Sequence, residues 1–219
     1  GLAAGSVPFG GHVMNLSKMD KILSMRRDSY GYFYVTVQPG LVLSQLKDNI
    51  RNKKFNINDW DGDSIEIYRK FIQSEEVFFS PDPTETSASI GGMVACNASG
   101  ARSYLYGPTR KYVEGLKIVL ANGDSITLKR NQIYSKKRIL ELTTDNGNLL
   151  RIQLPSYSMP KTKNASGYYI EDNMDAIDLF IGSDGTLGII TEIEIKLMKL
   201  PNTIWGVTCF LERNDTIFQ

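Results

Sequence analysis

The chain has 219 residues, of which 42% are hydrophobic and 22% are charged, and its formal net charge is +1. This is the composition of a globular protein with one large or two small domains, and it argues against nucleic acid or an anionic membrane as a partner. No apolar run approaches the roughly 20 residues that cross a bilayer, and no secretory signal is visible.

Cysteine and histidine are both rare. The two cysteines, Cys96 and Cys209, lie far apart and do not make a disulfide scaffold, which favours a reducing, cytoplasmic location. The single histidine, His12, and the absence of C-x-x-C or H-E-x-x-H spacings lead us to expect no metal site.

Both ends of the chain differ from ordinary domain boundaries, which fall in polar linkers. The sequence opens with the glycine-rich stretch 1–11 and closes with 212–219, directly after a strand-like run. We interpret it as a fragment; the alternative is an ordinary protein with frayed ends.

The first part of the chain contains strand and helix patterns. Residues 12–19 suit a short strand and turn. Residues 33–40 are β-branched and aromatic and end at a Pro-Gly breaker, which predicts a strand. Apolar residues recur every four positions in 41–52 and predict a helix, and 63–73 suits a second helix.

Two hairpins are predicted in the second half. Apolar runs flank Asn122-Gly123 within 114–128 and Asn146-Gly147 within 138–155. Such dipeptides favour two-residue turns in which both residues have positive φ.

The last elements complete an α+β pattern. Residues 173–188 suit a short helix, capped by Asp172 or Asn173, that ends in a glycine turn. Residues 189–200 alternate apolar and polar side chains and predict a half-buried strand, and 203–212 predict another. The fold class expected is therefore α+β with largely antiparallel sheets and flanking helices.

Segment 80–110 is a long loop with little periodicity, and such loops in compact domains are functional or disordered. It offers glycines that let a backbone approach a ligand, and neutral donors able to hold a diphosphate: Gly91, Gly92, Gly100, Ser87, Ser89, Asn97 and Ser99. On composition alone, a stiff loop crossing the surface is an equal alternative.

A second glycine loop, 182–190, leads directly into a strand, where backbone groups can read the edge of a flat ring; a simple helix-to-strand turn is the alternative. The glycine cluster 1–6 would be a third loop. No G-x-G-x-x-G motif is present in a βαβ unit, which disfavours a Rossmann site.

In this order, the three loops resemble the FAD-binding domain of the p-cresol methylhydroxylase/vanillyl-alcohol oxidase (PCMH/VAO) superfamily. Within it they are most similar to the group of the glycolate oxidase D-subunit, D-lactate dehydrogenase and D-2-hydroxyglutarate dehydrogenase. The matching strings cover most of the chain: GLAAGSVPFGGHVMNLSKMDKI (1–22), VQPG (37–40), PDPTETSASIGGMVACNASGARSYLYGPTRKYVEGLKIVLANG (81–123), KNASGY (163–168) and DLFIGSDGTLGIITEIEIKL (178–197).

The resemblance implies the residues that contact FAD. At Asp184 the family more often has Glu, which keeps the charge. The implied set is Gly1 in the first diphosphate loop, Pro81, Asp82, Thr84 and Ser87 beside the flavin, Ser89, Ile90, Gly91 and Gly92 near the diphosphate, Asn97, Ala98, Ser99 and Gly100 in the next turn, Tyr106, Gly107 and Thr109 in the YG-x-T run, and Asp184, Gly185, Thr186, Gly188, Ile189 and Ile190 in the last loop and strand.

The resemblance also implies the organisation of the chain. Residues 1–200 would be a PCMH-type FAD-binding domain without its N-terminal start, and 201–219 the beginning of a cap domain. In the family this cap supplies catalytic histidines, a metal site in many members and substrate-binding arginines, so no catalytic residue is assigned here. His12 matches no covalent attachment motif, so we expect non-covalent FAD.

The activity implied is that of an FAD-dependent oxidoreductase. Its substrate would be a small 2-hydroxy acid such as D-lactate, glycolate or 2-hydroxyglutarate, and its electron acceptor a protein, a quinone or oxygen. The alternatives are a flavin-binding module without turnover, or a superfamily member with another substrate such as an ether-lipid precursor or a sugar lactone.

Overall fold

The computed structural model describes residues 7–165, 167–208 and 210. Gly1, expected at the first diphosphate loop, lies outside the described residues. His12 is exposed in a segment without regular structure.

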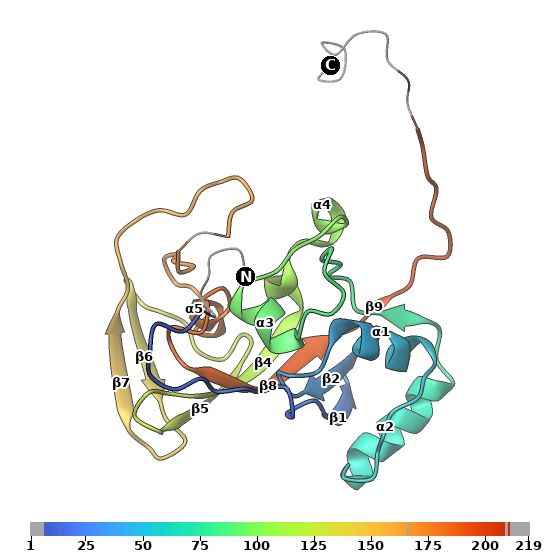
Figure 1. The fold of residues 1–219 in the computed structure, drawn as a ribbon, viewed down its shortest axis with the longest axis horizontal. Coiled ribbons are helices and arrows are strands. Elements are labelled where there is room, and N and C mark those ends of the chain that lie inside the picture. The colour runs from blue at the N-terminus through green and yellow to red at the C-terminus, as the bar shows by residue number, and fades with distance from the viewer. Residues whose placement is uncertain (1–6, 166, 209, 211–219) are drawn as a thin grey trace.

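An antiparallel sheet of five strands forms the centre of the fold (Figure 1). In spatial order its strands are β1 (Ile22–Arg27), β2 (Phe33–Val37), β8 (Ile189–Lys196), β4 (Val113–Val119) and β5 (Ser125–Lys129). Because β8 lies between β2 and β4, the glycine loop before β8 is held at the middle of the fold.

The predicted alternation of β8 is interrupted by a bulge. Against β4, Lys117 pairs with Glu192 and Ile118 with Ile190, so Thr191 is the extra residue. Such a residue shifts the side-chain register of a strand from one face to the other. The buried positions therefore change phase across the bulge, from Ile190 to Ile193 and Ile195.

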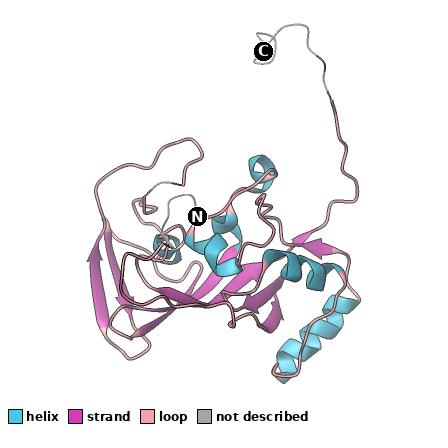
Figure 2. Ribbon diagram, in the orientation of Figure 1, coloured by secondary structure: helices cyan, strands magenta, loops and turns pink. Residues whose placement is uncertain are grey.

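Two longer helices and three short ones lie around the sheet in the described part of the chain. The longer helices are α1 (Leu43–Arg51) and α2 (Gly62–Ile72), and the short ones are α3 (Ile90–Ala95), α4 (Ser103–Tyr106) and α5 (Ile177–Phe180), with a 3₁₀ turn at Thr109–Tyr112. Figure 2 shows α3, α4 and α5 on the same side of the sheet, while α2 projects from the end that carries β1.

The two predicted N-terminal helices are confirmed, and each has a clear cause. In α1, Leu43, Leu46 and Ile50 form one buried face. In α2, the Asp61 carboxylate accepts a hydrogen bond from the backbone N–H of Ser64 and caps the helix. Phe71 on the same helix packs edge-on against Phe33 of β2 at 5.2 Å between ring centroids, which fixes α2 to the sheet.

Both predicted hairpins are present, but their turns differ from the prediction. At Asn122-Gly123 only the glycine has positive φ, and Leu120 pairs with Asp124 around a three-residue loop. The hairpin of β6 (Ile139–Thr143) and β7 (Leu149–Gln153) turns in the same way at Gly147. Each loop is a tight turn followed by a glycine in the left-handed conformation. Like the predicted two-residue turn, this loop is common in hairpins of twisted strands.

Other expectations are wrong in detail. Residues 12–19 form no strand, since their main-chain hydrogen bonds close a turn at Leu16 and Met19 instead. Segment 80–110 is not irregular throughout, because it contains α3 and α4. The short helix near 177 is confirmed, but neither Asp172 nor Asn173 caps it.

The C-terminal strand prediction is also corrected where it can be seen. Residues 203–208 are described and form no strand, and much of 209–219 lies outside the described residues. The last described pairing joins β3 (Val77–Phe78) to β9 (Met198–Lys199). The expected α+β class with largely antiparallel sheets is confirmed.

Candidate functional site

The two described glycine loops meet at the C-terminal end of α3. The backbone N–H of Gly182 donates to the carbonyl of Val94 at 3.0 Å, and that of Asp184 donates to the carbonyl of Ala95 at 2.8 Å. Segments about 90 residues apart in the chain are thereby joined through main-chain hydrogen bonds. Their side-by-side position is the basis of the candidate site.

The turn 97–100 is held in place by the run that follows it. Thr109, which is fully buried, donates both its N–H and its hydroxyl to the Ala98 carbonyl, at 2.9 and 2.7 Å. The N–H of Arg110 donates to the side-chain oxygen of Asn97 at 2.9 Å. Asn97 has a φ of 47°, a left-handed conformation that this bond supports.

Arg110 then connects this turn to the second loop. Its guanidinium donates to the carbonyl and carboxylate of Asp178 and to the carbonyl of Ile181, and it lies over the ring of Tyr169. Burial lowers the pKa of Arg110, with the charge of Asp178 acting in the opposite direction. Arg130 forms a second ion pair with Asp178 at 2.9 Å and also approaches the Asp175 carboxylate at 3.9 Å, so two arginines face two carboxylates here.

The second loop presents backbone to solvent. Asp184 and Gly185 both have positive φ, of 53° and 77°, and no atom lies within 4 Å of the position that a Cβ would take at Gly185. Gly188, in contrast, is packed against the sheet, since a Cβ there would lie 2.7 Å from the Ile118 side chain. The loop thus turns outward at 184–186 and packs tightly again where β8 begins.

Glycines of the first loop also divide into two kinds. A Cβ at Gly91 would lie 2.5 Å from Pro39, and one at Gly100 would lie 1.7 Å from the Asp82 carbonyl, so both allow close contact between chain segments. Gly92 is exposed, and its Cβ position is near only the Ser89 hydroxyl, at 3.1 Å. Gly92 and Gly185 are the positions where a ligand could approach the backbone.

A cleft of about 800 Å³ lies beside these loops, within the usual range for small-molecule sites. One wall is the turn 97–100 with Arg110 and Gly182, and the other is the segment 159–171. Most of the lining groups are neutral: amides, hydroxyls and glycine backbone. Donors of this kind suit a diphosphate-bearing cofactor held by dipoles, so the residues present fit FAD.

The structure distributes the predicted contact residues over distinct environments. Asn97, Ser99 and Gly100 line the cleft. The exposed ones are Thr84, Ser87, Gly92, Asp184, Gly185 and Thr186, and the half-buried ones are Asp82, Ser89, Asn97, Ala98, Ser99, Gly100, Tyr106, Gly107, Gly188 and Ile189.

Five predicted residues are buried and support the site from within: Pro81, Ile90, Gly91, Thr109 and Ile190. Asp82 differs from the rest because its carboxylate lines another cleft, between α1 and β3. Direct contact of any of these residues with FAD stays a prediction.

Residues to which sequence reasoning gave no role hold the segment that forms the far wall of the cleft. The Tyr168 hydroxyl bonds the Thr186 hydroxyl at 2.7 Å, and Tyr157 donates to the Tyr168 carbonyl. Arg138 holds both ends of the segment by bonding the Pro155 carbonyl and the Asp172 carboxylate. The KNASGY string was the available signal, but the tyrosine pair and Arg138 depend on contacts distant in sequence.

Tyr169 lines the cleft, and its pKa differs from that of a free tyrosine. Burial raises its pKa to about 12, with Glu171 contributing in the same direction. The phenol therefore stays protonated at neutral pH and can donate a hydrogen bond. Among the described residues, no group of three His, Cys, Asp or Glu side chains is placed to bind a metal ion.

Comparison with known proteins shows what the chain is similar to. A family model described as an FAD binding domain matches residues 62–129. Residues 62–129 of this chain are therefore similar to an FAD-binding domain. D-lactate dehydrogenase of Anaerostipes hadrus is 30% identical to it over 205 residues, which cover 93% of this chain and 30% of that protein. Glycolate oxidase subunit GlcD of Bacillus subtilis (strain 168) is 30% identical over 220 residues, covering 100% of this chain and 34% of that protein.

The chain spans about a third of the length of these curated relatives. Among solved structures, an alkyldihydroxyacetonephosphate synthase aligns with 87% of this chain and 24% of that chain, with a TM-score of 0.48 and 18% identity. No helix in the described parts of the chain is long and apolar enough to cross a membrane.

Proposed function

We propose that this chain is the FAD-binding portion of a flavin-dependent oxidoreductase that oxidises a small 2-hydroxy acid of the D-lactate, glycolate or 2-hydroxyglutarate type. The observation that carries the proposal is the junction of turn 97–100 with loop 182–186 beside a neutral cleft. The names of the two relatives, D-lactate dehydrogenase and glycolate oxidase, support the substrate class.

The residues of this chain would bind and orient the cofactor non-covalently. Asn97, Ser99 and the exposed backbone at Gly185 would donate to its polar groups, while Thr109 and Arg110 fix the backbone that carries them. When bound, FAD supplies the hydride acceptor for the α-carbon of the substrate. The segment 159–171 would limit access of water to the same cleft.

The remaining parts of the proposal concern partners. No histidine lines the cleft among the described residues, so the proton acceptor would come from another part of the parent protein. The reduced flavin would pass electrons to an acceptor protein or a quinone. We propose a cytoplasmic location for the parent protein, and residues 201–219 as the start of a cap domain.

Flavin binding is tested by titrating FAD into the purified chain and following flavin fluorescence, with riboflavin as the control that lacks diphosphate and adenosine. The proposal is supported if the flavin fluorescence is quenched saturably and the chain binds FAD at least about tenfold more tightly than it binds riboflavin. Equal affinities, or no quenching, would contradict it.

Turnover is tested on the full-length parent protein. Anaerobic addition of D-lactate, glycolate or D-2-hydroxyglutarate should bleach the flavin absorption band, and L-lactate and L-2-hydroxyglutarate serve as controls. Flavin binding without bleaching by any of these acids supports the alternative of a binding module, or of another substrate such as an ether-lipid precursor or a sugar lactone.

A further inference from the structure

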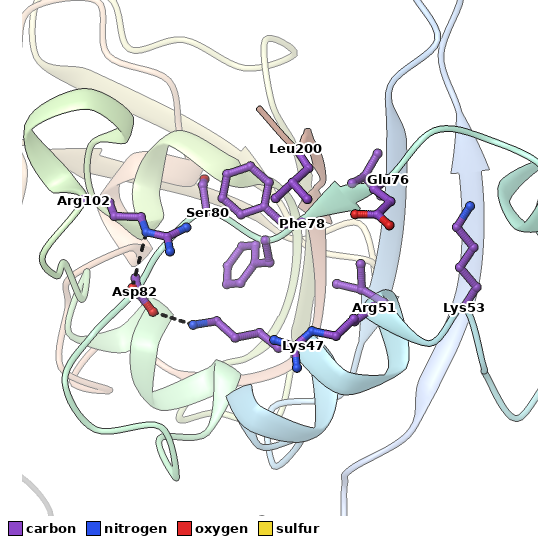
Figure 3. Close-up of a pocket in the computed structure, with 12 residues that line it drawn as sticks. Lys47, Arg51, Lys53, Glu76, Phe78, Ser80, Asp82, Arg102 and Leu200 are labelled. Carbon is purple, nitrogen blue, oxygen red and sulfur yellow. Dashed lines mark hydrogen bonds and ion pairs between the residues drawn. The ribbon is translucent and has the colours of Figure 1, made fainter. Parts of the chain in front are cut away.

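A second cleft, of about 440 Å³, lies between α1, β3 and the start of α4 (Figure 3). No residue that lines it also lines the cleft assigned to FAD. The two sites approach each other at Asp82, whose carboxylate lines the second cleft while its carbonyl touches Gly100. The second cleft is thus separate from the FAD cleft but adjacent to it.

Positive charge exceeds negative charge in this cleft. Lys47 approaches one Asp82 oxygen at 2.6 Å, and Arg102 approaches the other at 3.6 Å. Figure 3 shows both cations directed at this one carboxylate. A single carboxylate cannot neutralise two cations, and Lys47 and Arg102 both remain partly exposed to solvent. An incoming anion would therefore find donors within reach.

The opposite wall of the cleft is apolar. Phe78 and Val77 of β3, Ile50 of α1 and Leu200 line it, and Phe78 is held edge-on by Tyr106 at 5.4 Å between ring centroids. A cavity with an apolar wall and a few convergent charges is typical of sites for small organic ligands. The volume leaves room for a ring or a branched chain next to the charged group.

Ser80 adds a buried polar group to the wall of the cleft. It lines the cleft and is only 1% exposed. Its hydroxyl faces the Tyr112 phenol, whose oxygen donates to the Tyr106 carbonyl and can still accept a hydrogen bond from Ser80. The charges and the apolar wall of the cleft, and not Ser80, therefore indicate the kind of ligand it would hold.

We propose that this cleft is a second binding site, for a small organic carboxylate with an apolar body. The carboxylate of the ligand would take the place of Asp82 between Lys47 and Arg102, and its apolar body would pack against Phe78 and Leu200. Because Asp82 competes with the ligand for the same cations, removing its charge should strengthen binding.

The test is calorimetric titration of the purified chain with benzoate, with benzyl alcohol as an uncharged analogue of similar size and inorganic phosphate as an anion without an apolar body. Benzoate should bind saturably, at least about fivefold more tightly than either control. Equal binding of benzoate and benzyl alcohol, or tighter binding of phosphate, would overturn the proposal.

Three substitutions sharpen the test. Arg102→Gln should weaken benzoate binding about fivefold or more, and Asp82→Asn should tighten it about threefold or more. Arg151→Gln, on the exposed β7 strand, is the matched control and should change nothing. An unchanged benzoate affinity in both Arg102→Gln and Asp82→Asn, with circular dichroism spectra like that of the parent chain, refutes the site.

The same titration separates this site from the FAD cleft. Benzoate affinity should be the same within about twofold in the presence and absence of saturating FAD. Loss of benzoate binding when FAD is present would place benzoate in the FAD cleft and overturn the proposal. Failure of FAD to bind would leave the benzoate result standing, so the two proposals fail independently.

Discussion

One guanidinium nitrogen of Arg110 donates to two oxygens of Asp178, the main-chain carbonyl at 2.5 Å and the carboxylate at 3.0 Å. Arg110 lies in the 3₁₀ turn that follows the first loop and Asp178 in helix α5, just before the second loop, and both side chains are mostly buried. The contact joins turn 97–100 to the start of loop 182–186, because Arg110 also binds Asn97 and Ile181. Cofactor binding and stability should therefore both depend on this residue.

Replacing Arg110 by methionine should lower the free energy of unfolding by about 3 kcal/mol, since it leaves the carbonyls of Asp178 and Ile181 without their donor and removes one of the two cations paired with the Asp178 carboxylate. Urea unfolding followed by circular dichroism measures this change. Arg151→Met, which loses only an exposed pair with Glu141, should cost less than about 1 kcal/mol. Similar losses in the two variants would show that Arg110 does not join the loops.

The Thr109 hydroxyl should affect FAD affinity because it supports turn 97–100 from the interior of the fold. Thr109→Val removes the bond to the Ala98 carbonyl while keeping the side-chain shape, at a cost of about 1 kcal/mol of stability. FAD affinity, measured by flavin fluorescence, should fall with it because turn 97–100 loses one of its supports. Thr109→Ser retains the hydroxyl, and it should restore the affinity; equal affinities in the two variants would argue against this role.

Gly185 and Gly123 form a matched pair for testing the outward-facing loop. Both have positive φ, of 77° and 86°, and both have open space where a Cβ would lie. Alanine at either position should cost about 1 kcal/mol of stability through the same backbone strain. Only Gly185→Ala should weaken FAD binding, because Gly123 lies in the β4–β5 hairpin turn. A parallel loss in both variants would show that strain alone is responsible.

Stability should fall in acid through Glu194, which lies almost buried on β8 between Arg26 and Lys129. Burial acts to raise the pKa of Glu194, but the hydrogen bond from Arg26 and the charge of Lys129 outweigh it, so the pKa lies below its usual value. The ionised side chain therefore stabilises the folded state above the unfolded pKa of about 4.3, and this contribution disappears as pH falls through the folded pKa.

The measurement is the free energy of unfolding in urea at several pH values between neutral and strongly acidic. Glu194→Gln should flatten the acid side of this profile, whereas Glu141→Gln, at an exposed site, should leave it unchanged. Burial raises the pKa of Glu114 and the charge of Glu194 adds to that shift, so the comparison is repeated in a Glu114→Gln background. A profile that keeps its slope in Glu194→Gln would contradict the assignment.

Local features of the fold could be predicted from the sequence. The hairpins at Asn122-Gly123 and Asn146-Gly147 and the helix α1 depend on neighbouring residues, so composition and spacing indicate them directly. The predicted turn type is wrong at both hairpins. The Asn-Gly dipeptide suits a two-residue turn and also the three-residue loop with a left-handed glycine that the structure contains, so the sequence does not distinguish the two. The bulge at Thr191 was missed for a related reason, since it appears only when β8 pairs with β4.

Features that depend on distant contacts could not be predicted in the same way. The helix α3 begins at Ile90 although two glycines follow, because Ser89 caps it and Gly91 donates to the Pro39 carbonyl. Arg110 gave no signal in the sequence, since its partner Asp178 lies 68 positions away. The glycine loops could be identified as a site, but the groups that hold them together required the structure.

The position of β8 has a consequence for biosynthesis. A nascent chain emerging from the ribosome contains β1, β2, β4 and β5 well before it contains the strand that joins the two halves of their sheet. Until residues 189–196 emerge, the edges of β2 and β4 are open, and such edges can pair with other chains. Pairing of strands so far apart in the sequence is intrinsically slow, so the open strands should depend on chaperones until residues 189–196 have emerged.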